Sequence, residues 1–169
     1  MKHTTTQKGF TLVELLLYVA IAGSLLLLTT AFLFMLLEAR VKNQTIAEVE
    51  QQGLQVMQNI TQSVRNAEGI TAPTVGGSSP SLTLDVVSGV DDPTVYTLNS
   101  GTIEVTEGGG GAVALTNTRV TASGLSFENL SRAGTPGVIR VSFTLTHVNP
   151  DNRQEYTFSK TFYASASVR

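Results

Sequence analysis

Residue types that commonly carry enzymatic or metal chemistry are scarce in this 169-residue chain. There is no cysteine, which excludes thiolate nucleophiles, disulfides and cysteine-bound metals. Histidine occurs only at His3 and His147. Strand alternation places His147 on the same face as Leu145. We therefore expect His147 to be a partly buried histidine with satisfied hydrogen bonds, rather than a metal ligand or a catalyst.

Three further groups of residues show no recognisable reactive pattern. Asp91 and Asp92 are adjacent carboxylates, but calcium takes about six to eight oxygen ligands and no EF-hand spacing is present. A solvated turn is favoured there, and calcium binding stays open. Ser123 and Ser126 lie in no motif that supplies a base, and no Lys-Ser or Lys-Thr pair follows the glycines at 108–111. We expect no catalytic residue, no metal site and no cofactor, so the chain is not predicted to be an enzyme.

One carboxylate, Glu14, stands in a stretch that is apolar enough to cross a membrane, KGFTLVELLLYVAIAGSLLLL at residues 8–28. A charge in hydrocarbon is costly unless it is paired or neutralised. The 23 residues at 15–37 carry no formal charge, and about 20 apolar residues suffice to span a bilayer. A signal peptide cut after Ala31 is the alternative, but its apolar core is usually only about 7–15 residues long. The sequence predicts a membrane span whose acid needs a partner.

The residues GFTLVELL at 9–16 resemble the N-terminal motif of type IV prepilins. The resemblance implies that residues 1–9 are a leader, that a prepilin peptidase cuts between Gly9 and Phe10, and that the new amine of Phe10 is methylated. It also implies that Glu14 meets the amine of a neighbouring subunit when helices bundle, which makes the charge tolerable. The alternative is that Glu14 lies near the membrane interface without a partner.

A single long helix is expected to carry this motif. No proline occurs before Pro73, so nothing forces the helix to end at the membrane surface. Residues 10–37 are expected to form the transmembrane or filament-core part, and residues 38–69 an amphipathic continuation that ends at Gly69. Its apolar stripe comprises Ile46, Val49, Gly53, Val56, Met57, Ile60 and Val64.

Residues 70–169 are predicted to form a β-rich globular domain. Alternation of apolar and polar residues is clearest in SLTLDVV at 81–87 and in VIRVSFTLTHV at 138–148. The expected fold class is α+β, with the long N-terminal helix packed against a mostly antiparallel sheet. This arrangement also resembles the pilin fold.

Turn signals separate the expected strands. Residues 99–101 (NSG) are expected to close a hairpin, and residues 149–152 (NPDN) to turn the chain into its last strand. Residues 72–80 are rich in Gly, Ser, Thr and Pro and are expected to be a loop. The last strand is expected to hold three aromatic side chains on one packed face: Tyr156, Phe158 and Phe162.

The resemblance favours a structural subunit of a type IV pilus or pseudopilus. A minor subunit is preferred, because the mid-span proline of many major pilins is absent and QQGLQVMQNITQSVRNAEGI at 51–70 resembles minor pilins and J-type pseudopilins. The implied partners are other pilin or pseudopilin subunits, the prepilin peptidase and the pilus assembly platform in the membrane. A membrane-anchored adhesin or DNA-capture module and an anchored enzyme are the alternatives.

The balance of charges bears on location and partners. Lys2 and Lys8 precede the span and favour an inside N terminus, although Arg40 and Lys42 follow it. We expect a single-pass protein of the cytoplasmic membrane before assembly, and an extracellular or periplasmic filament afterwards. Residues 70–169 hold eight acidic and six basic residues without a basic block, so no nucleic-acid site is predicted.

Overall fold

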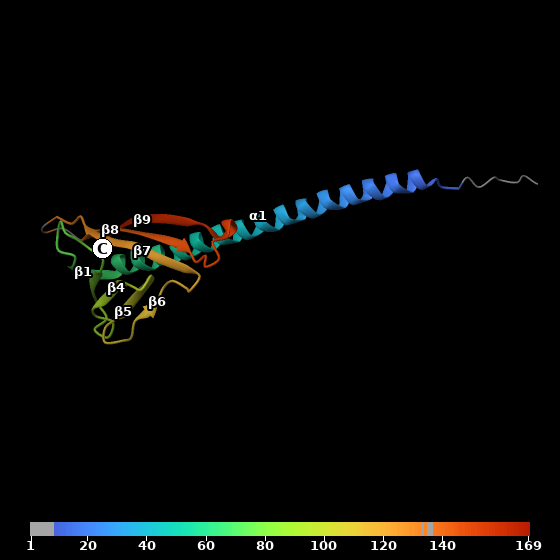
Figure 1. The fold of residues 1–169 in the computed structure, drawn as a ribbon. Coiled ribbons are helices and arrows are strands. Elements are labelled where there is room, and N and C mark those ends of the chain that lie inside the picture. Colours follow the sequence, from blue (N-terminus) through green and yellow to red (C-terminus); the bar gives the residue numbers. More distant parts are fainter. Residues whose placement is uncertain (1–8, 133, 135–136) are drawn as a thin grey trace, which may run out of the picture. The chain divides into compact units, whose positions relative to one another are not determined.

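A computed structural model describes residues 9–132, 134 and 137–169 of the chain. The chain divides into two compact units, residues 1–40 and 41–169, which are described separately. One helix, α1 (Leu12–Asn66), contributes residues to both units (Figure 1). All strands found in the described residues belong to the second unit.

The helix ends earlier than the sequence predicts. It stops at Asn66, and β1 (Ala67–Ala72) begins at the next residue. Gly69 is opposite Asp85 in the pairing of β1 with β3 (Leu82–Val86). The expectation that Gly69 ends the helix is therefore wrong. Pairing with a neighbouring strand decides where this segment leaves the helix, and it outweighs the local preference of glycine for helix ends.

The strands form two antiparallel sheets, which Figure 1 shows as separate groups of arrows. The first sheet has the order β1-β3-β4-β5-β6 and includes β4 (Thr94–Asn99), β5 (Thr102–Glu107) and β6 (Val113–Ala114). The second has the order β2-β7-β8-β9, with β2 (Ser78–Ser79), β7 (Val120–Asn129), β8 (Val138–His147) and β9 (Ser159–Ser167). A short 3₁₀ helix, η1 (Gln154–Tyr156), precedes β9. The predicted α+β, pilin-like architecture is confirmed.

The division into two sheets was not foreseen, and β6 explains it. This strand has only two residues, Val113 and Ala114, and both are exposed. It therefore offers a further strand an edge of only two residues for backbone hydrogen bonds. The chain continues into β7 instead, where the N–H of Ala122 donates to the carbonyl oxygen of Gly101 (2.7 Å). This bond joins the second sheet to the β4–β5 turn of the first.

The predicted hairpin and strand alternation are confirmed. Asn99 pairs with Thr102, which leaves Ser100 and Gly101 as a two-residue turn with φ values of 49° and 83°. Positive φ at both turn positions is the geometry that fits the twist of a hairpin. The inward face of β8 is buried at each expected position: Ile139, Val141, Phe143 and Leu145.

Two local predictions are wrong. The segment 72–80, expected to be a loop, contains β2, which pairs with β7. Of the three aromatic residues expected on the last strand, Tyr156 lies in η1 and Phe158 precedes β9, so only Phe162 belongs to that strand. The side chain of Asn149 causes part of this difference, because it bonds to the backbone of the loop and closes a turn there.

The part of α1 in the second unit supplies one side of the core. The predicted stripe is confirmed except at its start, where Thr45 is buried and Ile46 is only half-buried. The hydroxyl of Thr45 donates to the carbonyl oxygen of Val41 (3.1 Å), so its burial leaves no unpaired donor. The buried helix residues are Thr45, Val49, Gly53, Val56, Met57, Ile60 and Val64.

Gly53 lets the second sheet approach the helix closely. A Cβ atom built on Gly53 would lie 2.1 Å from the ring of Phe162 in β9. That ring is buried and stacks on Phe143 of β8 at a centroid distance of 5.5 Å. The absence of a side chain at Gly53 thus lets the aromatic pair reach the helix backbone.

Tyr96 makes the corresponding contact from the first sheet. The side chain is buried, and its hydroxyl hydrogen-bonds Asn59 Oδ1 (2.7 Å) and Ser63 Oγ (2.6 Å) on α1. Burial raises the pKa of the Tyr96 phenol; the hydrogen bond with Ser63 lowers it, and the nearby charge of Glu107 raises it.

The Gly53–Phe162 contact predicts the effect of a small-to-large substitution. Gly53→Val should lower the free energy of unfolding by at least the ~1–3 kcal/mol that overpacking usually costs, because the ring has to move. Urea unfolding of the full chain in detergent, followed by tyrosine fluorescence, measures this change. Gly23→Val is the matched control, since no atom lies within 4 Å of a Cβ at Gly23 of the same helix. Equal midpoints for the two variants would contradict the packing argument.

The raised pKa of Tyr96 predicts a loss of stability at alkaline pH. Above about pH 10, the phenol of the unfolded chain loses its proton while the folded chain retains it, so stability falls as pH rises. Urea unfolding between about pH 9 and 11 should show a shallower fall for Tyr96→Phe than for the unchanged chain. Tyr163→Phe, at an exposed tyrosine, should keep the original slope. Identical slopes for Tyr96→Phe and the unchanged chain would refute the assignment.

Candidate functional site

The predicted processing site lies immediately before α1. Gly9 and Phe10 are exposed and precede the helix, whereas the rest of the expected leader, residues 1–8 with His3, lies outside the described residues. A Cβ atom at Gly9 would meet nothing within 4 Å, and Gly9 is not in the left-handed region. No contact of the described chain therefore requires glycine at this position, and the Gly9–Phe10 bond is open to an external enzyme.

Thr11 sets the start of the helix, and the sequence analysis overlooked it. The N–H of Glu14 donates to Thr11 Oγ1 (3.3 Å), and the N–H of Leu15 donates to the Thr11 carbonyl oxygen (3.2 Å). Thr11 is thus the N-cap residue. The spacing Thr-x-x-Glu at residues 11–14 is the sequence signal for such a cap and could have predicted it.

Glu14 occupies the first turn of α1 with its side chain exposed. No ion pair of Glu14 occurs within the described part of the chain. An acid in the first turn is favoured by the helix dipole, but typically by only about 0.3–1 kcal/mol. An acid at the centre of a membrane helix costs about 2.5–3.5 kcal/mol. The helix dipole alone would not offset a cost of that size, so an acid buried in lipid would need a further partner.

The apolar part of α1 has no cover within its own unit. Every residue from 9 to 40 is exposed, and within the described residues one helix, α1, is long and apolar enough to cross a membrane. The hydroxyls of Ser24, Thr29 and Thr30 donate to carbonyl oxygens of the preceding turn (2.8, 2.9 and 2.8 Å). These polar groups therefore carry no unpaired donor into an apolar environment.

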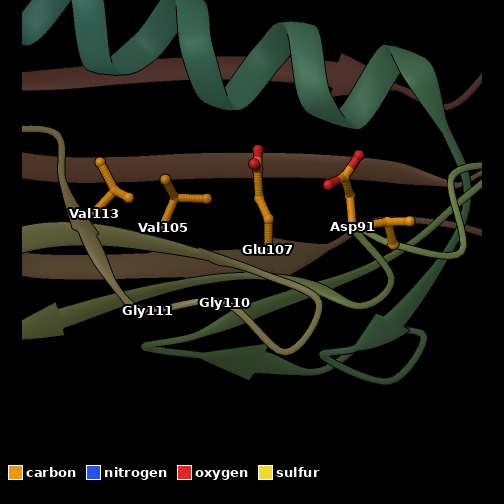
Figure 2. A pocket seen from close by; sticks show the side chains of 7 residues that line it. Asp91, Val105, Glu107, Gly110, Gly111 and Val113 are labelled. Atoms are coloured by element: carbon orange, nitrogen blue, oxygen red, sulfur yellow. The ribbon is translucent and has the colours of Figure 1, made fainter.

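The two aspartates of the β3–β4 loop have different surroundings. Asp92 Oδ1 accepts the N–H of Val86 (3.3 Å) and thereby helps to close the loop. Asp91 and Glu107 line a pocket of about 340 Å³, and Figure 2 shows their carboxylates pointing in the same direction. Within the described residues, no group of three or more His, Asp or Glu side chains is arranged to hold a metal ion. Two carboxylates fall short of the ligand set that calcium prefers.

At Gly108, the glycine run after β5 packs closely against the β3–β4 loop. A Cβ atom at Gly108 would lie 1.9 Å from the carbonyl oxygen of Val90, and Gly108 has a φ of 53°. Its N–H donates to the carbonyl oxygens of Asp91 and Pro93 (3.0 Å each). This glycine is therefore needed for packing between loops.

His147 ends β8 in a nearly closed environment. Its Nε2 lies 3.7 Å from Glu48 Oε2 on α1, its ring stacks on Tyr156 of η1, and its side chain is 10% exposed. Glu48 also accepts hydrogen bonds from Arg119 (3.4 Å) and Asn117 (3.3 Å). The predicted burial is confirmed. The expected satisfaction of its hydrogen bonds is wrong at Nδ1, which is buried without a partner among the described residues.

Comparison with known proteins bears on the N-terminal region. Residues 4–30 match the family model described as the prokaryotic N-terminal methylation motif. No curated protein and no solved structure matches the chain. The match includes Gly9, Phe10 and Glu14 together with the first half of the apolar helix. This motif is a structural, pilin-type motif and does not define an enzyme family. The chain thus carries the type IV prepilin-like signal, which marks it as a type IV pilin- or pseudopilin-like precursor.

Proposed function

We propose that the chain is a structural subunit of a type IV pilus or pseudopilus that assembles through its N-terminal helix. The observation that carries this proposal is the uncharged stretch at residues 15–37, whose side chains are all exposed. Lipid is a suitable cover before assembly, and the helices of other subunits are a suitable cover afterwards. The pilin-type motif at residues 4–30 implies both kinds of contact in general terms.

Processing between Gly9 and Phe10 is the first step of the proposed function. The exposed peptide bond before the cap residue Thr11 supports it, because exposed, non-helical chain segments are the preferred sites of proteolytic cleavage. Cleavage there would create a positive amine at Phe10, four residues before Glu14. Methylation of this amine keeps its positive charge.

Pairing with a neighbour is the proposed role of Glu14. Its carboxylate is exposed at the start of the span and makes no ion pair in the described chain. The Phe10 amine of an adjacent subunit supplies a counter-ion of the right sign. Because two point charges meet only at certain axial offsets, such a pair also fixes the stagger between neighbouring helices.

A minor subunit of the assembly is the more specific proposal. The helix is unbroken from Leu12 to Asn66, even across Gly23 and Ser24, and it has no mid-span proline. The other partners we propose are the prepilin peptidase and the assembly platform in the membrane. Before assembly the chain would cross the cytoplasmic membrane once, with Lys2 and Lys8 inside. The mature subunit would then belong to an extracellular or periplasmic filament.

The processing step predicts a defined mature N terminus. Mass spectrometry of the mature protein should find a chain that begins with N-methylated Phe10. Gly9→Val should abolish cleavage, because a branched side chain would then face the peptidase at the scissile bond. Gly23→Val, within the helix, should be cleaved normally. A mature chain that still begins at Met1, or one that begins after Ala31, would refute the processing step.

The pairing role predicts that the charge of Glu14 matters for assembly. Glu14→Gln keeps the shape of the side chain and removes the charge, so the protein should still enter the membrane. Its incorporation into sheared filaments should fall at least about tenfold, since loss of a buried pair costs more than the ~1.4 kcal/mol that this factor represents. Glu38→Gln, at the other end of the uncharged stretch, is the matched control and should assemble normally. Normal incorporation of Glu14→Gln would eliminate the pairing role.

A further inference from the structure

A pocket of about 640 Å³ lies in the second unit where β8 turns back into β9. Three hydroxyl side chains line it from adjacent strands: Thr121 of β7, Thr146 of β8 and Ser159 of β9. The strand register places Thr121 opposite Thr146 and Thr146 opposite Ser159, so the three form one row across the sheet. The loop at residues 148–158 forms the opposite wall.

The lining of this pocket is polar and contains no Asp, Glu, Lys or Arg side chain. Hydroxyl and amide groups alternate with the apolar surfaces of Val148, Pro150 and Phe158, and the one ionisable lining residue is His147, whose Nε2 lies 3.7 Å from Glu48 Oε2 on α1. Arg153 and Glu155 belong to the same loop but do not line the pocket, and their charged side chains pair with each other. Apart from His147, which faces Glu48, the lining offers an anionic ligand no basic side chain, and it offers a cationic ligand no carboxylate.

The loop wall is held in place by many hydrogen bonds. Asn149 bonds to the backbone N–H and carbonyl of Arg153 (2.9 and 2.8 Å) and to Thr157 Oγ1 (3.0 Å). Lys42 of α1 donates to the carbonyl oxygens of Gln154 and Thr157 (3.2 and 2.5 Å). A loop held by this many hydrogen bonds presents a preformed surface. Ligand binding therefore costs little conformational entropy in the loop.

The side-chain amide of Asn152 is available for hydrogen bonds with a ligand. Asn152 is exposed, and its backbone has a φ of 52°, in the left-handed region that asparagine adopts more readily than most residues. The side-chain amide lines the pocket and makes no hydrogen bond within the described residues. It therefore offers both a donor and an acceptor to a bound molecule.

We propose that this pocket binds a neutral sugar. A pyranose ring has hydroxyl groups around its edge and an apolar C–H face, which match the hydroxyl row with Asn152 on one hand and Phe158 with Pro150 on the other. Within the row, Thr146 Oγ1 and Ser159 Oγ hydrogen-bond each other (3.0 Å), and each hydroxyl keeps further capacity to bond a ligand hydroxyl. The proposal concerns the isolated second unit and goes beyond the filament role, on which it does not depend.

The test uses the full chain in a detergent that has no sugar headgroup, such as a polyoxyethylene ether. The probes are methyl β-D-glucopyranoside, methyl β-D-galactopyranoside, methyl α-D-mannopyranoside and N-acetylglucosamine, each measured by saturation-transfer NMR. At least one probe should receive saturation, most strongly at its ring C–H protons. Its Kd should be on the order of 1 mM, which is typical of about a dozen ligand atoms. An absence of transfer to all four probes would overturn the proposal.

Two substitutions test whether the signal arises in this pocket. Asn152→Gly removes the amide and keeps the backbone conformation, since glycine readily adopts positive φ. Thr121→Val removes one hydroxyl at nearly constant volume. Together they should weaken binding at least fivefold, roughly the loss of one or two hydrogen bonds, with the urea midpoint unchanged. Tyr163→Ser, at the exposed aromatic residue of β9 outside the pocket, should leave binding unchanged.

Three outcomes would refute the sugar site. Unchanged binding by the Asn152→Gly, Thr121→Val double variant would place the contact elsewhere, and loss of binding in Tyr163→Ser would place it on the open sheet face. Saturation transfer to triglycine equal to that of the best sugar would identify a general polar pocket instead. Because all measurements use unassembled protein, a failure of filament assembly would not affect them.

Discussion

The structure depends first on a surface that the chain cannot bury by itself. The uncharged residues at 15–37 are helical, and all of them are exposed. Each large apolar side chain left in water forgoes about 1.5–3 kcal/mol, so fewer than ten of them outweigh the ~5–15 kcal/mol that stabilises a typical domain. The first unit is therefore not a folded domain in the usual sense. We infer that lipid or other helices would complete the stability of this helix, and the type IV prepilin-like signal at residues 4–30 agrees with that physical requirement.

In the second unit, by contrast, two sheets cover one side of the helix and bury the apolar residues there. One aromatic residue of each sheet contacts the helix, and the two contacts rest on different interactions. Phe162 contacts the backbone at Gly53 through van der Waals packing alone. Tyr96 is buried and places its hydroxyl against Asn59 and Ser63. The apolar contact tolerates changes of pH, whereas the polar contact fixes position, because a buried phenol without partners would be costly. Together they define how the sheets lie on this part of α1.

The sequence predicted those features that depend on a local pattern. The motif at Gly9, the alternation in β8 and the turn at residues 100–101 each follow from residue type and spacing, and so did most of the buried helix stripe. The failures share another cause. The end of the helix at Asn66, the division into two sheets and the short strand β2 are set by pairing with strands far along the chain, which a local pattern does not contain. The N-cap at Thr11 was missed for another reason: its Thr-x-x-Glu signal is local and was present in the sequence, but it was overlooked.

The proposed pairing of Glu14 has to be weighed against what lipid already provides. In a bilayer the apolar surface of α1 is covered before any partner arrives, and lipid tails are as apolar as leucine, so hydrophobic burial gives helices little reason to associate there. The acid is the exception. Thr11 accepts only the backbone N–H of Glu14, so the cap leaves the carboxylate itself unneutralised. A positive amine on a neighbouring chain would lower the free energy of the assembled state but not that of the monomer. Apolar area would then explain why the helix needs cover, and the single carboxylate would explain why another subunit covers it better than lipid does.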